Sequence, residues 1–469
     1  MLDSKSTVSK SRSRMSCYYL VLLETSGNQN YIFSTNRLRE NIGASELTYQ
    51  AGTKWILEAV SQLNDATPLE VWKDSQRLRE LLQNRDLNPP IENQQKPVEI
   101  LTAASGKALL LTQNQETAQQ IITDVTRKAV IEAPGLDVMG VYEEVPVARD
   151  FQNDETLAAA IKQIHAKFER ARSRRPSPES RFLRLPIIAE CAESGLPASS
   201  VDHSIPNQAT RISKVSQGKR SATQAGINRL QNIIHNQGSS RKLIQNINKL
   251  EKHFNPDELP WLAVVHADGN GLGQIFLNFQ EYIGNDKSNR NYIEQYRQFS
   301  LTLDQCTEAA FTEAIEIFPE KNGITPVVPL IIGGDDLTVV CDGQYALEFT
   351  REFLKQFEQQ IQTYKSTRSI AERAFEVERL SACAGVAVVK RHFPFSVAYE
   401  LAENLIKSAK TVKNQVTKTD NRAIPFPCSA IDFHILYDTS GAELGKIREA
   451  LQPNANTLLY NRPYVVTPL

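Results

Sequence analysis

The chain has 469 residues, of which 41% are hydrophobic, and a formal net charge of −1. This length predicts two to four domains with enough apolar content for packed cores, and no apolar stretch approaches the roughly 18 residues of a membrane span. The N-terminus is rich in Ser, Lys and Arg without a hydrophobic segment, so we predict no signal peptide and expect a cytoplasmic protein. Six cysteines without a C-x-x-C pair favour neither a disulfide framework nor a four-cysteine zinc site.

The first half of the chain shows the pattern of one α+β domain. After a tail, residues 1–15, that we expect to be disordered, residues 16–150 predict a β-α-β-β-α-β order. The expected elements are a strand at 17–23, a helix at about 28–60, strands at 98–102 and 108–112, a helix at 115–131 and a strand at 136–145, with a polar insertion at 65–96. This order is the ferredoxin-like plan.

The middle of the chain, residues 151–255, predicts a helical and basic connecting domain. Residues 155–172 are helical in pattern, and two basic helix-like stretches follow at 213–232 and 241–253. Between His203 and Leu250 there is no acidic residue, but there are eight basic ones: Arg211, Lys214, Lys219, Arg220, Arg229, Arg241, Lys242 and Lys249. This asymmetry suggests a phosphate-bearing partner, RNA or a nucleotide, with Arg211, Lys214, Lys219 and Arg220 as candidate contacts. For most of the eight, a solvated helical face is the alternative.

Residues 256–469 repeat the plan of the first half. We expect a strand at 261–267, helical segments to about 318, two strands around Gly333-Gly334, a helix at 346–364, a strand at 380–389 and an amphipathic helix at 394–412. The two halves therefore predict two similar domains in tandem.

An acidic hairpin carries the chemistry of the second half. Gly333-Gly334-Asp335-Asp336 lies between the apolar runs 326–332 and 337–341, which predicts a β-hairpin with both carboxylates at its tip. Two carboxylates about 4 Å apart repel by roughly 4 kcal/mol at an effective dielectric of about 20, so a fold that keeps both usually supplies a cation. Hard oxygen ligands favour Mg²⁺ or Mn²⁺.

A third carboxylate follows the strand at 261–267. In Asp268-Gly269-Asn270-Gly271-Leu272-Gly273, an EF-hand would need an oxygen ligand at Leu272 and a glutamate at Phe279, and a dinucleotide fingerprint would need a different glycine spacing. Taken alone, the turn could be only a surface turn. Beside the acidic hairpin, however, Asp268 completes the arrangement by which palm-type polymerases and nucleotide cyclases hold two metals.

The first half lacks these acids. It has Glu24 after its first strand and Ser105-Gly106-Lys107 at its hairpin, so we expect a structural partner without a catalytic centre. The hairpin is no phosphate loop, because Leu101 stands where a glycine is required and Ala108 where Ser or Thr is required.

These motifs together resemble a known family. The turn 267–273, the hairpin 333–336, the run 381–388, and Pro394 with 402–410 resemble the catalytic palm of the large polymerase-cyclase subunit of type III CRISPR effector complexes. Residues 24–40 resemble the opening of that family's degenerate first palm, and Arg462-Pro463-Tyr464 resembles a common ending. GGDEF-type diguanylate cyclases share the hairpin. The resemblance implies an α+β fold with two ferredoxin-like, GGDEF-like palm domains in tandem, residues 16–150 degenerate and residues 256–469 catalytic.

The resemblance also implies a mechanism. Asp268, Asp335 and Asp336, with the Gly269 carbonyl, would bind two Mg²⁺ or Mn²⁺ ions, and a ribose 3′-hydroxyl would attack the α-phosphate of ATP or another nucleoside triphosphate. The product would be a cyclic nucleotide or oligonucleotide in antiviral signalling. The nucleotide contacts would be Gly269, Asn270, Gly271, Gly273, Gly333, Gly334 and Lys410. Lys410 matches the family's triphosphate-contacting lysine, with a solvated residue as the alternative, and we assign His266 no catalytic role.

Three departures from the family stand out. No His-Asp nuclease segment precedes the first palm, the zinc ribbon is reduced to Cys191 and Gly195-Leu196-Pro197, and the C-terminal helical domain is missing or shortened. We therefore expect a minimal cyclase that works alone or with CRISPR-type or effector proteins. Two alternatives remain open: an RNA-binding scaffold subunit with a vestigial metal site, and a GGDEF-like enzyme that makes a cyclic dinucleotide from GTP.

Overall fold

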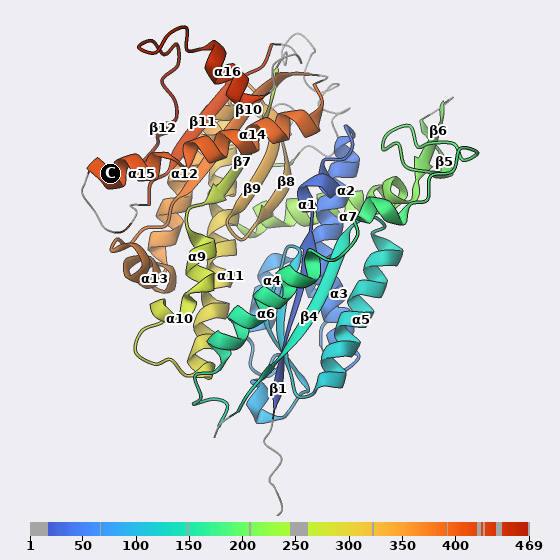
Figure 1. Cartoon of the computed structure of the whole chain (residues 1–469), viewed down its shortest axis with the longest axis vertical. Helices are drawn as coiled ribbons and strands as arrows, with labels where there is room; N and C mark the ends of the chain where they lie inside the picture. Colours follow the sequence, from blue (N-terminus) through green and yellow to red (C-terminus); the bar gives the residue numbers. More distant parts are fainter. Residues whose placement is uncertain are drawn as a thin grey trace, which may run out of the picture.

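The computed structural model describes residues 17–467, except residues 66, 148–149, 206–207, 244–260, 321–322, 392, 420–423, 425–426 and 438–442. The tail predicted to be disordered lies outside the described residues, as does most of the second basic stretch, of which 241–243 are extended and not helical. Two units of sheet and helix are stacked on each other, the N-terminal one at the lower right and the C-terminal one at the upper left (Figure 1).

The first unit has four strands and five longer helices. Its elements are β1 (Tyr18–Ser26), α1 (Asn28–Ile32), α2 (Leu38–Gly52), α3 (Lys54–Ser61), η1 (Glu70–Lys73), α4 (Ser75–Gln83), η2 (Ile91–Asn93), β2 (Val98–Ala104), β3 (Lys107–Thr112), α5 (Gln115–Glu132) and β4 (Asp137–Val145). The helix predicted at 28–60 is three helices, because the backbone leaves helical geometry after Ile32 and again at Thr53. The polar insertion contains α4, which begins at an Asp74 cap.

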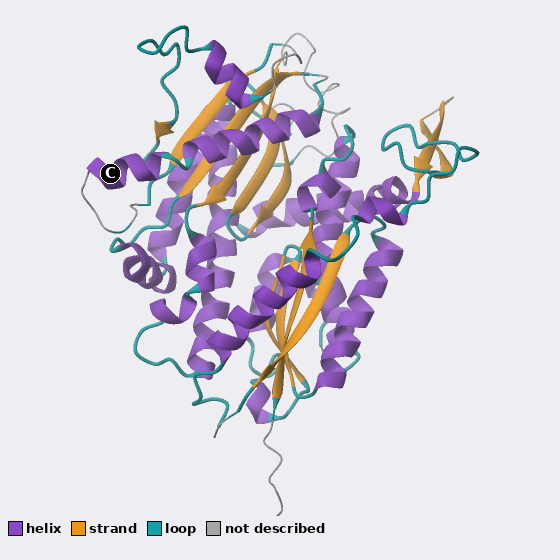
Figure 2. Ribbon diagram, viewed as in Figure 1, coloured by secondary structure: helices purple, strands orange, loops and turns teal. Residues whose placement is uncertain are grey.

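A connecting segment follows. It comprises α6 (Leu157–Arg172), η3 (Pro178–Arg181), the antiparallel ribbon β5 (Ala198–Ile205) and β6 (Gln208–Ser213), and α7 (Lys214–Asn236). The β5–β6 ribbon stands apart from both sheets (Figure 2). α7 returns to the first unit and packs against α2, where the Gly43 Cα approaches so closely that a Cβ would lie 1.7 Å from the Lys219 carbonyl oxygen.

The second unit carries the larger sheet. Its elements are β7 (Trp261–Gly269), α9 (Leu272–Leu277), α10 (Phe279–Tyr282), α11 (Asn289–Ala314), η4 (Ile315–Ile317), β8 (Val327–Gly333), β9 (Asp336–Asp342), α12 (Ala346–Thr363), α13 (Lys365–Phe375), β10 (Ala382–Lys390), α14 (Phe395–Ala409), α15 (Val412–Thr419), β11 (Ala430–Ile435), α16 (Leu444–Ala450) and β12 (Tyr464–Val465). Phe349, Phe353 and Phe357 recur every four residues along α12 and are fully buried, which fixes one face of this helix on the core.

The two sheets share one topology. The first has the order β2-β3-β1-β4, and the second has β8-β9-β7-β10 in the corresponding places, extended by β11 and β12. Both are antiparallel at these four strands, and β11 adds parallel to β10. This order is that of ferredoxin-like palm folds, so the predicted α+β class is confirmed.

Buried ion pairs join the two units. Arg290 and Arg297 of α11 both bind Glu99 of β2, with Arg290 Nη1 and Arg297 Nη2 at 2.8 and 2.6 Å from Oε1. Glu99 is fully buried, which alone would favour its neutral form, but the two guanidinium groups hold its pKa below the ordinary value. Because a buried carboxylate without these partners would be costly, the ion pairs fix how the units sit together.

No helix in the described part of the chain combines the length and apolar character needed to cross a membrane.

Candidate metal centre and adjoining cavity

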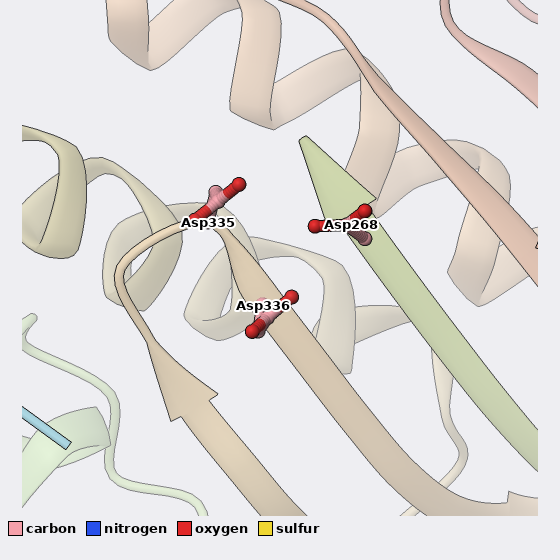
Figure 3. Close-up of side chains that lie close together, drawn as sticks. All are labelled: Asp268, Asp335 and Asp336. Carbon is pink, nitrogen blue, oxygen red and sulfur yellow. The ribbon is translucent and has the colours of Figure 1, made fainter. Parts of the chain in front are cut away.

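Three aspartates come together at the edge of the second sheet. Asp268 lies near the end of β7, Asp335 in the β8–β9 turn and Asp336 at the start of β9. One carboxylate oxygen from each lies within 4.8 Å of the others, and the side chains face one another (Figure 3). Pairing of Ala267 with Leu337 explains the match, because it places Asp268 across from Asp336. The two-residue turn is Gly334-Asp335, so Asp336 belongs to the strand and not to the hairpin tip.

The negatively charged carboxylates of Asp268, Asp335 and Asp336 repel one another. Burial and the neighbouring Asp268 raise the pKa of Asp335 to about 6. Burial, Asp335 and Asp268 raise the pKa of Asp336 well above its ordinary value. Carboxylates this close favour a bound cation or a proton, and their oxygen atoms are the ligands that Mg²⁺ and Mn²⁺ prefer. Within the described residues, this is the only group of three or more His, Cys, Asp or Glu side chains placed to hold a metal ion.

Lys410 lies against the same group. Its ammonium forms an ion pair with Asp268 Oδ2 and donates to the Gly269 carbonyl at 3.2 Å. Lys410 directly follows α14, which lies so close to β10 that a Cβ on Gly385 would be 2.0 Å from the Ala402 carbonyl oxygen. The missing side chain at Gly385 therefore brings Lys410 within reach of the triad.

The glycines near the triad have different roles. A Cβ on Gly269 would lie 2.7 Å from Asp335 Oδ2, so this glycine lets the hairpin approach β7. Gly271 precedes α9 with a φ of 74°, and Gly334 takes a φ of 61° in the turn, both in the left-handed region that favours glycine. Gly333 has only ordinary contacts, and a Cβ on Gly273 would meet open space, so no steric reason requires glycine at 273.

Asn270 differs from its predicted role. It is 3% exposed, and its Nδ2 donates to Ser381 Oγ at 2.9 Å and to the Cys428 carbonyl at 3.0 Å. These bonds attach the turn to β10 and to the segment before β11. We therefore correct the prediction of nucleotide contact: the Asn270 side chain holds the turn from behind.

A cavity of about 480 Å³ adjoins the triad and lies between the two units. The second unit contributes His266, Asp268, Ile331, Gly333, Asp336, Tyr399, Glu403, Ile406, Lys407 and Lys410, and the first contributes Asn28, Gln29, Ile32, Ser45, Thr48 and Ser105. The sequence did not identify the walls. Tyr399, Glu403 and Lys407 recur every four residues before Lys410, a spacing that could have predicted one shared helical face. No local sequence pattern predicts that residues of the first unit form the other wall of the cavity.

His266 is tied into the structure. It is 7% exposed, with Nδ1 at 3.2 Å from the Leu337 carbonyl and Nε2 at 3.3 Å from the Tyr399 hydroxyl. Nδ1 also lies 2.9 Å from Thr338 Oγ1, so both ring nitrogens have hydrogen-bond partners within the protein. Burial lowers the pKa of His266 and keeps it neutral.

The basic segment is largely engaged within the protein. Lys219 is fully buried and donates to Ser34 Oγ at 2.7 Å, Arg220 Nε donates to Glu40 Oε1 at 2.7 Å, and Arg229 Nε donates to Glu46 Oε2 at 2.8 Å. Lys219 is buried among neutral oxygens and Arg220 is paired with Glu40, so both side chains are engaged within the protein in place of the phosphate contacts that the sequence predicted. Arg211 and Lys214 are exposed, as is Lys242. Arg241 binds Glu316, and Lys249 lies outside the described residues.

Cys191, which the sequence predicted to be the remnant of a zinc ribbon, is buried, and none of the six cysteines, all within the described residues, forms a disulfide. Its Sγ lies 3.7 Å from Ser216 Oγ.

Comparison with known protein families gives a match that lies within the second unit. Residues 261–417 match the family model of the second palm domain of Cas10/Cmr2, which confirms the resemblance inferred from the motifs. A search of curated proteins gives no match.

Several solved structures are similar in fold. The Csm1–Csm4 cassette in complex with cA4 shows 14% identity, a TM-score of 0.45, and coverage of 85% of this chain and 53% of that chain. The same cassette with AMPPNP shows 14% identity, a TM-score of 0.46, and coverage of 85% and 54%. The apo state of the type III-B Cmr-beta complex shows 11% identity, a TM-score of 0.47, and coverage of 90% and 70%. The chain thus spans about half the length of the Csm1–Csm4 chains it matches.

Proposed function

Residues 261–417 carry a second palm domain of the Cas10/Cmr2 family, and from this premise we propose that the chain is a nucleotidyltransferase that cyclises a nucleoside triphosphate. The substrate we propose is ATP, and the product is a cyclic nucleotide or a cyclic oligoadenylate. The proposed setting is cytoplasmic CRISPR-type antiviral signalling, with other proteins of such a complex as partners.

The residues present fit a divalent metal centre. Asp268, Asp335 and Asp336, with the Gly269 carbonyl, would hold Mg²⁺ or Mn²⁺, because they converge as oxygen ligands whose mutual repulsion a cation relieves. When bound, two such ions would supply Lewis acidity for the attacking hydroxyl and for the triphosphate oxygens.

The side chains around the centre would orient the substrate. Lys410 would exchange its ion pair with Asp268 for the triphosphate, where its charge offsets the charge of the leaving pyrophosphate. The oxygen of a ribose 3′-hydroxyl would form the new bond to the α-phosphorus, the bond to pyrophosphate would break, and the hydroxyl proton would pass to solvent. His266 and Tyr399, which hold each other, would form a fixed wall.

One observation carries the proposal: the three aspartates converge at the rim of a cavity of about 480 Å³ whose walls come from both palm units. A cavity of this size accepts a mononucleotide. The raised pKa values of Asp335 and Asp336 also argue against a vestigial site, because uncompensated acids in this position cost stability without a cation.

The test is an incubation of the purified protein with Mg²⁺ or Mn²⁺ and each labelled nucleoside triphosphate in turn, alone and with RNA or partner proteins. Asp335→Ala/Asp336→Ala is the control. We expect pyrophosphate and a cyclic product from ATP with the native chain only. Consumption of GTP in place of ATP would favour a GGDEF-like cyclic dinucleotide synthase, and no turnover under any condition would refute the enzyme.

An RNA-binding role is supported by the exposed Arg211 and Lys214 of the connecting segment. If these residues contact phosphates, RNA affinity should fall steeply with salt, and Arg211→Ala/Lys214→Ala should flatten that slope by up to about two units. A response to salt that the double variant leaves unchanged would remove this role.

A further inference from the structure

The turn that presents Asp335 and Asp336 is bound by α11. The Gly334 N–H donates to Asp304 Oδ1 at 3.0 Å, and Thr307 Oγ1 donates to the Gly334 carbonyl at 2.5 Å. Asp304 and Thr307 lie three residues apart on α11 and thus share one face. Both backbone polar groups of Gly334 are therefore taken by side chains of one helix, and the direction of the turn depends on where those side chains lie.

Asp304 is held in turn by the first palm unit. Arg79 of α4 places Nη1 at 2.9 Å from Asp304 Oδ2 and Nη2 at 2.8 Å from Glu308 Oε2. Arg79 and Glu308 are 9% and 2% exposed. One guanidinium thus bridges two carboxylates one turn apart on α11, which leaves the other oxygen of Asp304 directed at Gly334.

The negative charges of Asp304 and Glu308 explain why the Arg79 guanidinium is needed between them. Burial and the neighbouring Asp304 raise the pKa of Glu308 to about 7, in spite of Arg79. Without Arg79, two carboxylates of like charge would face each other in this pocket, and their repulsion would push Asp304, the more exposed of the two, toward solvent. That movement would weaken its bond to Gly334.

The tips of the two hairpins lie near each other with ordinary contacts. A Cβ on Gly333 would lie 3.4 Å from Asp304 Oδ1 and 3.7 Å from the Cβ of Ser105 at the tip of the first unit's hairpin. The space enclosed by Arg79, Asp304, Ser105 and Gly333 measures about 20 Å³, room for about one water molecule. The cluster is therefore too small to bind a ligand.

We propose that Arg79, in the insertion of the degenerate palm, is a positioning residue for the metal-binding hairpin, acting through Asp304 on the Gly334 turn. This inference rests on the proposed function in so far as Asp335 and Asp336 bind metal. The first palm unit thereby has two roles at the site, since it lines the cavity and also sets the geometry of the metal ligands. A misplacement of ligands by about 1 Å can cost about a hundredfold in rate.

The test compares Arg79→Met with Arg77→Met in the full-length chain. Arg77 lies on the same helix and is exposed, whereas Arg79 is buried, so Arg77 controls for loss of a charge on α4. For each folded variant, Mn²⁺ affinity is measured by electron paramagnetic resonance without nucleotide, and kcat and KM are measured with the accepted triphosphate. We expect Arg79→Met to weaken Mn²⁺ binding and lower kcat by about tenfold or more with a smaller change in KM, and Arg77→Met to stay within about twofold of the native chain.

Asp304→Asn provides a second variant. It keeps an oxygen for the Gly334 N–H but loses the charge that Arg79 binds, so its Mn²⁺ affinity should fall less than that of Asp304→Ala. Native Mn²⁺ affinity and kcat in folded Arg79→Met, or in Asp304→Ala should Arg79→Met not fold, would overturn the proposal. A native chain that binds Mn²⁺ but turns over no triphosphate would refute the proposed function alone, since the Mn²⁺ measurements still decide on Arg79. A native chain that binds no Mn²⁺ would refute both.

Discussion

The two palm units place different side chains on the same backbone plan. In the first, Glu24 of β1 pairs with Lys107 at the start of β3, and Lys107 Nζ lies 3.3 Å from Glu24 Oε2. In the second, Asp268 of β7 lies across from Asp336 at the start of β9. Each position follows a two-residue turn, Ser105-Gly106 in one hairpin and Gly334-Asp335 in the other.

The comparison shows that few side-chain differences separate an ion pair from a candidate metal centre on the same backbone plan. In the first unit, a lysine ammonium stands at the position of Asp336 and neutralises the acid beside it. In the second unit, three acids face one lysine, Lys410, which comes from outside the hairpin. This excess of negative charge favours a divalent cation at the second unit's triad. Loss of the charge excess is therefore enough to explain the expected inactivity of the first unit.

The strongest test of the contrast removes matched acids. Asp336→Ala should lower turnover by about three orders of magnitude, the scale on which lost transition-state charge stabilisation acts, and should abolish Mn²⁺ binding. Glu24→Gln, at the corresponding place in the first unit, should leave turnover within about twofold. Initial rates and Mn²⁺ titrations of both variants give the comparison. Equal losses of turnover in the two variants would show that Glu24 of the first unit also contributes to the activity.

Lys410 should act in opposite directions on metal and on substrate. Lys410→Met removes the ammonium that binds Asp268, so Mn²⁺ should bind more tightly without nucleotide, whereas kcat/KM should fall by about ten- to a hundredfold because the triphosphate loses a cation. Lys390→Met, at the exposed end of β10, is the control. Weaker Mn²⁺ binding in Lys410→Met would contradict the exchange of partners.

The acids of the second unit should destabilise the metal-free protein at neutral pH. The folded-state pKa of Asp335, about 6, lies above its ordinary 3.8, and the pKa of Asp336 is also raised, so their contribution is present at low pH and lost as pH rises through 6. Asp336→Asn should therefore raise the free energy of unfolding by about 1 kcal/mol at pH 7.5, or about 2–4 °C in Tm, and by less at pH 4.5.

Adding Mn²⁺ to the same unfolding experiment gives a second test of the triad. It should raise the Tm of the native chain at pH 7.5 and leave Asp336→Asn unchanged, because only the folded native site binds the ion. Thermal unfolding followed by circular dichroism at both pH values gives the readout. A variant less stable than the native protein at pH 7.5 without metal would contradict the raised pKa values.

The smallest effect is expected in the first unit. Lys107→Met breaks a partly exposed ion pair, so stability should fall by no more than about 1 kcal/mol and turnover should not change. Lys107→Asp places two acids opposite each other and should cost more, with part of the loss restored by millimolar Mn²⁺. Urea unfolding with and without the ion tests this. If Mn²⁺ restores nothing, two opposed acids on this backbone are not enough to attract a metal.

The sequence predicted the parts of this molecule that are local. The acidic hairpin, the strand that ends near Asp268 and the ferredoxin-like order follow from glycine turns and apolar runs, which neighbouring residues decide. Sequence patterns failed where distant residues decide. Lys219 and Arg220 were predicted to contact phosphates, because the residues that bind them, Ser34 and Glu40, lie far away in the chain and could not be foreseen as neighbours. Asn270 was predicted to contact the nucleotide because its hydrogen-bond partners, Ser381 Oγ and the Cys428 carbonyl, lie far away in the chain.

The stack of Phe33 on Tyr399, with ring centroids 4.0 Å apart, joins the segment after α1 to α14 behind a wall of the cavity that Tyr399 lines. Tyr399 also bonds His266, which lies on the strand that carries Asp268. A change in the shape of residue 33 would therefore be transmitted through Tyr399 to the candidate site of the second unit. The first unit, which carries no acid at the place of Asp336, thus has a sequence requirement of its own that arises from the wall it supports.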